Sequence, residues 1–302
     1  MKSVITMEHV IKHFKGHTAV NDLSLDIQEG SITALLGPNG AGKTTSISMM
    51  LGLARPSSGT VTVMGGSPQD TAVRQAIGAM LQDINVIDRL KVDETLDLFR
   101  NCYTRPLSLK HLLDISGLDA ARHQYANALS GGQKRRLDFA LAMAGDPSLL
   151  FLDEPTVGMD IEARQLFWET IRKLAAEGRT ILLTTHYLEE ADRLADRVIV
   201  INRGRKIADG SPAEIKGLRG QKTVAFSVPT EEAASGRAAN LISTLQDVLS
   251  AEWDGSRVTL TSPDTDRLIY ELVRSGIDMS EIAIESGGLA DAFQFLIQGD
   301  EQ

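Results

Sequence analysis

The sequence predicts an α/β fold with a mixed sheet at its core, an antiparallel β subdomain, a helical insert and a small C-terminal α+β domain. Short apolar runs at residues 31–36, 148–152 and 180–185 are typical of buried parallel strands. Helix-like segments follow these runs, as expected where helices connect parallel strands. A length of 302 residues is sufficient for about two domains.

The composition is that of an ordinary soluble globular protein, with 42% apolar and 24% charged residues. No apolar run approaches the roughly 18 residues that a membrane-spanning helix requires. Charge interrupts residues 1–9 too early for a secretory signal. The single cysteine, Cys102, excludes an internal disulfide and fits a reducing, cytoplasmic environment. No His or Cys cluster has the spacing of metal ligands.

Residues 3–29 alternate between apolar and polar side chains in two runs, which predicts two half-buried antiparallel strands. Between the runs lies His13-Phe14-Lys15-Gly16, with Phe14 in a turn. An aromatic side chain at this position is either a core residue or a platform on which a base stacks. The alternation alone favours the core.

The nine residues from 37 to 45 fit the phosphate-loop pattern G-x-x-x-x-G-K-[ST] in full. An apolar strand precedes them and a helix-like run follows, so that backbone N–H groups and a helix dipole point at one spot that suits a polyphosphate. Lys43 would reach the β- and γ-phosphates, and the Thr44 hydroxyl would bind Mg²⁺. The loop consists of Gly37, Pro38, Asn39, Gly40, Ala41, Gly42, Lys43, Thr44 and Thr45.

Further strand ends carry polar residues that such a ligand needs. A strand over 76–82 ends on Gln82, at the sheet edge where ligands bind in open α/β folds. The strand over 148–153 ends in Asp153 and Glu154, a Walker-B arrangement that places carboxylates near a phosphate-bound metal. A polar turn that happens to contain two acidic residues is the alternative interpretation of Asp153 and Glu154. This alternative is much less plausible for a strand that follows a phosphate loop in the same chain. The strand over 180–185 ends at His186.

The remaining segments complete the expected organisation. Residues 86–145 lose strand patterns and predict the helical insert, and a boundary near Lys216 separates domains at 1–215 and 216–302. The C-terminal domain has seven basic and fourteen acidic residues, which argues against nucleic acid or anionic lipid as its partner. We expect a strand and turn at 60–66, and further strands at 222–228, 257–262 and 281–285. We also expect helices at 161–177, 188–196, 238–250, 265–275 and 289–297, a loop at 230–237, and a hairpin at 197–208 with a four-residue turn at 202–205.

A second candidate anion site is the segment Leu129-Ser130-Gly131-Gly132-Gln133, which opens a predicted helix. A simple N-cap with a flexible glycine pair would also explain this segment. One nucleotide does not need two such sites in one molecule. Two chains paired head to tail do need them, if each nucleotide lies between one chain's phosphate loop and the other chain's Ser130, Gly131, Gly132 and Gln133.

Together these motifs resemble the ATP-binding cassette (ABC) ATPases, the nucleotide-binding subunits of ABC transporters, which are P-loop NTPases. The resemblance covers residues 3–215, and it reverses the periodicity-based interpretation of Phe14. It implies ATP and Mg²⁺ as cofactors. In this family Phe14 would stack on adenine, Thr44 and Asp153 would bind the metal, Gln82 would contact the metal and water, Glu154 would be the catalytic residue and His186 the switch residue. Residues 37–45 would be the Walker A motif, 129–133 the ABC signature, and Asp160 the D-loop aspartate.

Details favour the drug- and antibiotic-export branch of this family, of the daunorubicin-resistance type. Residues 155–160 (Pro-Thr-Val-Gly-Met-Asp) and 184–192 fit that branch, and 288–296 resembles its C-terminal motif more weakly. Two residues depart from the commoner pattern: Phe14 replaces Tyr, and the D-loop begins with Val157 rather than Ser. The branch implies a homodimer of cassettes and a separate six-helix permease, which would hold this chain at the cytoplasmic, inner face of the cell membrane.

A soluble ABC-type ATPase acting on nucleic acid or the ribosome is the alternative. Such proteins usually carry a coiled-coil insert, two cassettes in one chain or basic surfaces, and this sequence predicts none of them. A phosphate-loop kinase or GTPase is excluded by the segment 129–133. The transported substrate is not encoded in these motifs, because the permease would bind it.

Overall fold

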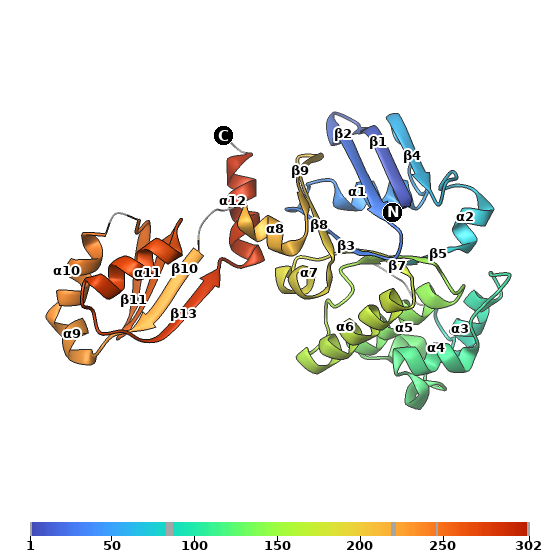
Figure 1. The fold of residues 1–302 in the computed structure, drawn as a ribbon. Coiled ribbons are helices and arrows are strands. Elements are labelled where there is room, and N and C mark those ends of the chain that lie inside the picture. Colours follow the sequence, from blue (N-terminus) through green and yellow to red (C-terminus); the bar gives the residue numbers. More distant parts are fainter. Residues whose placement is uncertain (1, 83–86, 219–221, 246, 301–302) are drawn as a thin grey trace. The chain divides into compact units, whose positions relative to one another are not determined.

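The computed structural model describes residues 2–82, 87–218, 222–245 and 247–300. The chain forms two compact units, Met1–Pro212 and Ala213–Gln302 (Figure 1). The boundary that we expected near Lys216 falls inside helix α8 (Pro212–Gly217). The expected start of the helical insert at Val86, and residues 219–221 after the expected boundary, lie outside the described residues.

A six-stranded sheet forms the centre of the first unit, with the strand order β5-β6-β7-β3-β8-β9. Five strands are parallel and β9 is antiparallel, so the predicted mixed sheet is confirmed. Every residue of β3, β6 and β7 is buried, as expected for mostly apolar strands at the centre of a parallel sheet. The strands are β3 (Ile32–Leu36), β5 (Ile77–Met80), β6 (Leu149–Asp153), β7 (Thr180–Thr184), β8 (Arg197–Asn202) and β9 (Arg205–Gly210).

The β8–β9 hairpin has a two-residue turn, so the predicted four-residue turn is wrong. Pairing continues to Asn202 and Arg205, because Arg203 (φ 47°) and Gly204 (φ 75°) both adopt the left-handed conformation of a tight hairpin turn. The Gly204 N–H donates to the Ala41 carbonyl at 2.9 Å, and its own carbonyl accepts from the Asn21 N–H at 2.9 Å. The turn therefore joins the phosphate loop to an N-terminal strand.

The predicted antiparallel subdomain is a three-stranded sheet of order β2-β1-β4, formed by β1 (Ser3–Phe14), β2 (His17–Gln28) and β4 (Ser58–Val63). Its inner face packs on α1 (Lys43–Met50) and on the larger sheet. One apolar core joins Ile5 and Leu23 of the small sheet, Ile47 of α1 and Phe151 of β6. This core fixes the phosphate loop between two sheets.

Helices cover the opposite side of the six-stranded sheet (Figure 1). Described residues 87–145 hold helices, turns and one isolated β-bridge between Lys91 and Tyr125, which confirms the helical character of the insert. No helix in the described part of the chain is both long and apolar enough to cross a membrane. The other α-helices of this unit are α2 (Thr71–Gln75), α3 (Val92–Arg100), α4 (Leu109–Ser116), α5 (Gly131–Met143), α6 (Ile161–Ala176) and α7 (Leu188–Leu194).

The second unit contains a four-stranded antiparallel sheet of order β11-β12-β10-β13. Its chain order, β-α-α-β-β-α-β-α, is that of a ferredoxin-like β-α-β-β-α-β unit with two helices after the first strand and an additional helix at the end. Phe226, Leu260, Ile242 and Leu272 contribute to a core between the sheet and its helices. The elements are β10 (Lys222–Ser227), α9 (Thr230–Ser235), α10 (Arg237–Ser243), β11 (Ser250–Asp254), β12 (Arg257–Ser262), α11 (Thr265–Arg274), β13 (Ser280–Ser286) and α12 (Leu289–Gly299).

Two expectations for this unit are wrong. The helix predicted over 238–250 ends at Ser243, and 250–254 form strand β11; Gln246 lies outside the described residues. All five β11 residues are exposed on this edge strand, so no buried apolar run marks it as a strand. Residues 230–235, expected as a loop, form α9, which ends at Gly236 with φ 69°.

Candidate nucleotide-binding site

A cavity of about 350 Å³ lies where β3 and β6 end. Its lining gathers most of the residues predicted to bind a nucleotide, together with two that were not predicted, His17 and Ala19. The lining residues are Phe14, His17, Ala19, Asn39, Gly40, Gly42, Lys43, Thr44, Thr45, Gln82, Asp153 and Glu154. Segments far apart in the sequence therefore converge on one site.

The phosphate loop connects β3 to α1 through backbone conformations that favour glycine. Gly40 has φ 81° and Gly42 has φ 103°, and a Cβ on Gly42 would lie 2.5 Å from the Ala19 carbonyl oxygen. Gly42 is the N-cap of α1, and no side chain caps this helix end. The first N–H groups of α1 are consequently positioned to bind an anion.

Lys43 turns back into the loop. Its Nζ donates to the carbonyl oxygens of Gly37 at 2.7 Å and Pro38 at 3.1 Å. Burial lowers the pKa of Lys43, while the carboxylates of Glu154 and Asp153 oppose this shift. Phosphate oxygens are charged acceptors and bind an ammonium more strongly than these carbonyls do, so Lys43 is placed to exchange them for a polyphosphate.

The Walker-B carboxylates follow β6 directly. Asp153 is buried, and the Thr184 hydroxyl at the end of β7 donates to its Oδ1. Glu154 has an unusual left-handed backbone (φ 52°), and its N–H donates to the Thr184 carbonyl at 3.1 Å. Its Oε2 lies 2.5 Å from His186 Nδ1 and accepts from the His186 N–H at 3.2 Å. Neighbouring strand ends thus hold both carboxylates in fixed orientations.

The donor set fits Mg²⁺. Thr44, Gln82 and Asp153 line the same cavity and offer hydroxyl, amide and carboxylate oxygens, the hard ligands that Mg²⁺ prefers. Among the described residues, no group of three or more His, Cys, Asp or Glu side chains could hold a metal ion. Mg²⁺ commonly needs only one or two protein carboxylates when phosphates and water complete its coordination.

Phe14 is 52% exposed and lines the cavity, so the periodicity-based expectation of a core residue is wrong. Phe14 is the last residue of β1 and pairs with His17 across the hairpin turn, where the sheet ends. The Lys12 Nζ lies 5.2 Å from the ring centroid. The sequence does contain a signal for His17: if Lys15-Gly16 is a two-residue hairpin turn, His17 lies opposite Phe14, as the structure shows.

The signature segment is not part of this cavity's lining within the described chain. Ser130 caps α5: its Oγ accepts from the Gln133 N–H at 3.3 Å, and Gln133 Oε1 accepts from the Ser130 N–H at 2.9 Å. A Cβ on Gly131 would meet no atom within 4 Å, and one on Gly132 only the Gly158 carbonyl oxygen, at 3.9 Å. The two glycines therefore border open space, whereas Leu129 is buried. Gly37, Pro38 and Ala41 belong to the loop but do not line the cavity either.

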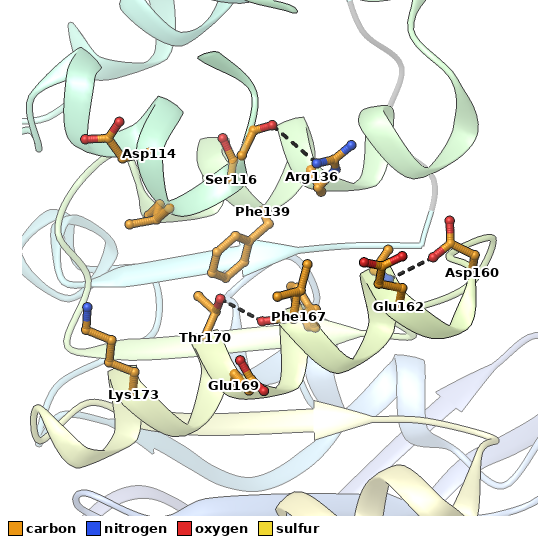
Figure 2. Close-up of a pocket in the computed structure, with 14 residues that line it drawn as sticks. Asp114, Ser116, Arg136, Phe139, Asp160, Glu162, Phe167, Glu169, Thr170 and Lys173 are labelled. Atoms are coloured by element: carbon orange, nitrogen blue, oxygen red, sulfur yellow. Dashed lines mark hydrogen bonds between the residues drawn. The ribbon is translucent and has the colours of Figure 1, made fainter. Parts of the chain in front are cut away.

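Asp160 caps α6 by accepting from the Ala163 N–H at 2.8 Å, and it lies on the rim of a second cavity of about 530 Å³ (Figure 2). This cavity lies between α4, α5 and α6, and Phe139 and Phe167 pack there edge to face at 5.1 Å. Asp160 is the only residue of the predicted nucleotide site among its described lining residues. The phosphate-loop cavity is consequently the candidate nucleotide site.

Known proteins are similar to this chain in sequence. Residues 20–157 match the ABC transporter family. The chain is 44% identical to the "Nod factor export ATP-binding protein I" of Burkholderia lata over 215 residues, which is 69% of this chain and 71% of that protein. It is 45% identical to the protein of the same name from Rhizobium johnstonii, over 69% of each chain.

Solved structures agree. The ATP-binding subunit of an ABC transporter superposes with a TM-score of 0.67 at 26% identity, covering 72% of this chain and 94% of that one. A dimeric ATP-binding cassette in a post-hydrolysis state, bound to ADP and Pi, gives 0.64 at 25% identity, covering 68% and 98%. Motifs, fold and similarity lead to one conclusion: the chain belongs to the ABC transporter family, as an ATP-binding and ATP-hydrolysing subunit.

Proposed function

We propose that this chain powers the export of a small molecule through a separate membrane permease, by hydrolysing ATP in the phosphate-loop cavity. The observation that carries the proposal is the convergence of Lys43, Asp153 and Glu154 on that cavity. The names of the relatives, export ATP-binding proteins, support the direction of transport.

The exposed Phe14 ring would stack on the adenine, and the N–H groups of the loop and Lys43 would hold the phosphates. Thr44, Gln82 and Asp153 would hold Mg²⁺, which neutralises charge on the phosphate oxygens. These residues fix the nucleotide before the reaction, so that little reorganisation is needed during it.

Glu154 would accept the proton of the attacking water, because it follows the metal-binding aspartate and its carboxylate is oriented by His186. His186 would also contact the γ-phosphate and keep it in register with Glu154. Lys43 would stabilise the negative charge that spreads over the γ-oxygens.

The signature residues Ser130, Gly131, Gly132 and Gln133, and Asp160, would act on the nucleotide of a second chain. Ser130 is exposed and lies outside the cavity lining of its own chain. A head-to-tail homodimer brings such a segment to the partner's phosphate loop, and dimeric cassettes are known among the structural relatives. Two composite sites would result.

The permease would place the chain at the cytoplasmic face of the cell membrane and would choose the substrate. The relatives carry the name of Nod factor export, and we propose a small exported molecule here without assigning that compound. A role on nucleic acid or the ribosome gains no support from these relatives or from the acidic C-terminal unit.

The test is co-expression with the neighbouring reading frame, which should encode about six apolar segments of roughly 20 residues. We expect the tagged chain to co-purify with that protein, and the complex in lipid nanodiscs to hydrolyse ATP in a Glu154-dependent manner. Failure to form a complex, or co-purification with ribosomes instead, would contradict the proposal.

A further inference from the structure

We propose that Arg135 is a positioning residue for ATP hydrolysis, which holds the backbones of Glu154 and Gln82 from helix α5 of the same chain. Arg135 is only 8% exposed. Its Nη2 donates to the Glu154 carbonyl at 2.8 Å, and its Nη1 donates to the carbonyls of Leu81 at 3.0 Å and Gln82 at 3.3 Å. The inference rests on the proposed function, because it assumes that Glu154 is the general base.

Glu154 needs such support because its backbone is strained. A non-glycine residue at φ 52° persists only where its surroundings fix it. The N–H of Glu154 is held by Thr184, and its carbonyl is held by Arg135. Because hydrogen bonds hold the backbone on both sides of the Glu154 Cα atom, they fix the orientation of its side chain and hence the alignment of its carboxylate with His186.

The same guanidinium reaches the exit of β5. The carbonyls of Leu81 and Gln82 lie beside the Glu154 carbonyl, although they belong to a different strand end. Arginine suits this arrangement, since its planar fork presents several donors in a fixed geometry. A lysine in its place would supply the charge without that geometry.

Asp138 fixes Arg135 in turn. Its Oδ2 lies 3.8 Å from Arg135 Nη1, one helical turn away, and both residues are buried. The Asp138 Oδ1 has no hydrogen-bond partner among the described residues. The carboxylate therefore acts as a local counter-charge that keeps the guanidinium aligned, while the three carbonyls take its hydrogen bonds.

The experiment compares Arg135→Met and Arg135→Lys with the matched control Arg136→Met. Arg136 is the next residue of α5, but it faces the second cavity and donates to the Gly117 carbonyl (Figure 2). We expect Arg135→Met to lower kcat by roughly 10- to 100-fold, with ATP affinity within about threefold of wild type. Arg135→Lys should recover part of kcat, and Arg136→Met should keep it.

Combination with Glu154→Gln separates positioning from general destabilisation. If Arg135 acts through Glu154, Arg135→Met should slow the Glu154→Gln variant by less than about twofold in single-turnover assays. Multiplicative effects, an unchanged kcat or a lost ATP affinity would overturn the inference. If Arg135→Met does not fold, Arg135→Lys carries the same comparison. A wild-type rate for Glu154→Gln alone would instead overturn the proposed base.

Discussion

His186 binds one carboxylate oxygen of Glu154 twice: its ring Nδ1 lies 2.5 Å from Oε2, and its backbone N–H donates to the same atom at 3.2 Å. The end of β7 therefore orients the carboxylate at the end of β6 through both side chain and main chain. Because β6 and β7 are parallel neighbours, this alignment depends on the register of the sheet.

Replacement of Glu154 by Gln tests whether this carboxylate is the base. The amide preserves an oxygen that accepts from His186, but it does not accept a proton from water. We expect ATP binding to persist, turnover to fall by roughly 10²- to 10⁴-fold, and a dimer holding ATP to accumulate. Phosphate release and size-exclusion chromatography with ATP provide the measurements, and hydrolysis at the wild-type rate would refute the assignment.

Mixed dimers test whether Ser130 acts on the partner's nucleotide. Lys43→Ala and Ser130→Arg chains should each be nearly inactive alone. In a mixed dimer, one composite site keeps an intact phosphate loop and an intact signature segment, so part of the ATPase activity should return. Two different affinity tags allow purification of the mixed species. No recovery in verified mixed dimers would count strongly against head-to-tail pairing.

A chain ending at Pro212 tests the independence of the first unit. Every described residue that lines the phosphate-loop cavity precedes this cut, and β9 is complete at Gly210. We expect ATP affinity by calorimetry to stay near that of the full chain, while hydrolysis slows if the second unit stabilises dimers. Lost binding with an intact circular-dichroism spectrum would show that the second unit contributes to the site.

Asp138→Asn should change how stability depends on pH. Burial raises the pKa of Asp138 from 3.8 to about 6, against the opposing charge of Arg135. At pH values between 3.8 and about 6, Asp138 is protonated in the folded state and ionised in the unfolded state. The folded state therefore binds more protons, and the contribution of this carboxyl to the free energy of unfolding falls as the pH rises. The unfolding free energy of Asp138→Asn relative to wild type should therefore increase by up to about 3 kcal/mol between pH 4 and pH 7.

Urea unfolding of both proteins at several pH values measures this difference, because other groups titrate alike in both. A constant difference across the range would contradict the raised pKa. Asp138→Ala provides a control without a polar group at this position.

Local patterns made much of the fold and site predictable. The phosphate loop is encoded in nine consecutive residues, and β3, β6 and β7 are short, mostly apolar runs, which are typical of buried strands. Strand β11 escaped prediction because it is a short, exposed edge strand, whose five residues form no apolar run that separates it from the predicted helix. The turn at Arg203 and Gly204 escaped because its polar residues also suit a longer loop.

Long-range contacts explain the other omissions. Arg135 carries no signal of its own, because its role depends on carbonyls of residues 81, 82 and 154, which only the folded chain brings together. Phe14 had two interpretations that alternation could not separate, since the end of the hairpin decides its exposure. The role of Arg135 and the exposure of Phe14 depend on contacts between distant segments, which the sequence of one segment does not reveal.

The hairpin turn at Gly204 has a consequence for how the protein tolerates variation. Gly204 is not among the described residues that line the phosphate-loop cavity, and it belongs to no nucleotide-binding motif. A Cβ at this position would nevertheless lie 2.8 Å from both the Asn21 nitrogen and the Val20 Cα. Any larger residue would push β2 away from the loop segment that Ala41 anchors to the same turn. In a saturation library selected for transport, position 204 should therefore be as depleted of variants as Gly42, although 162 positions of chain separate them.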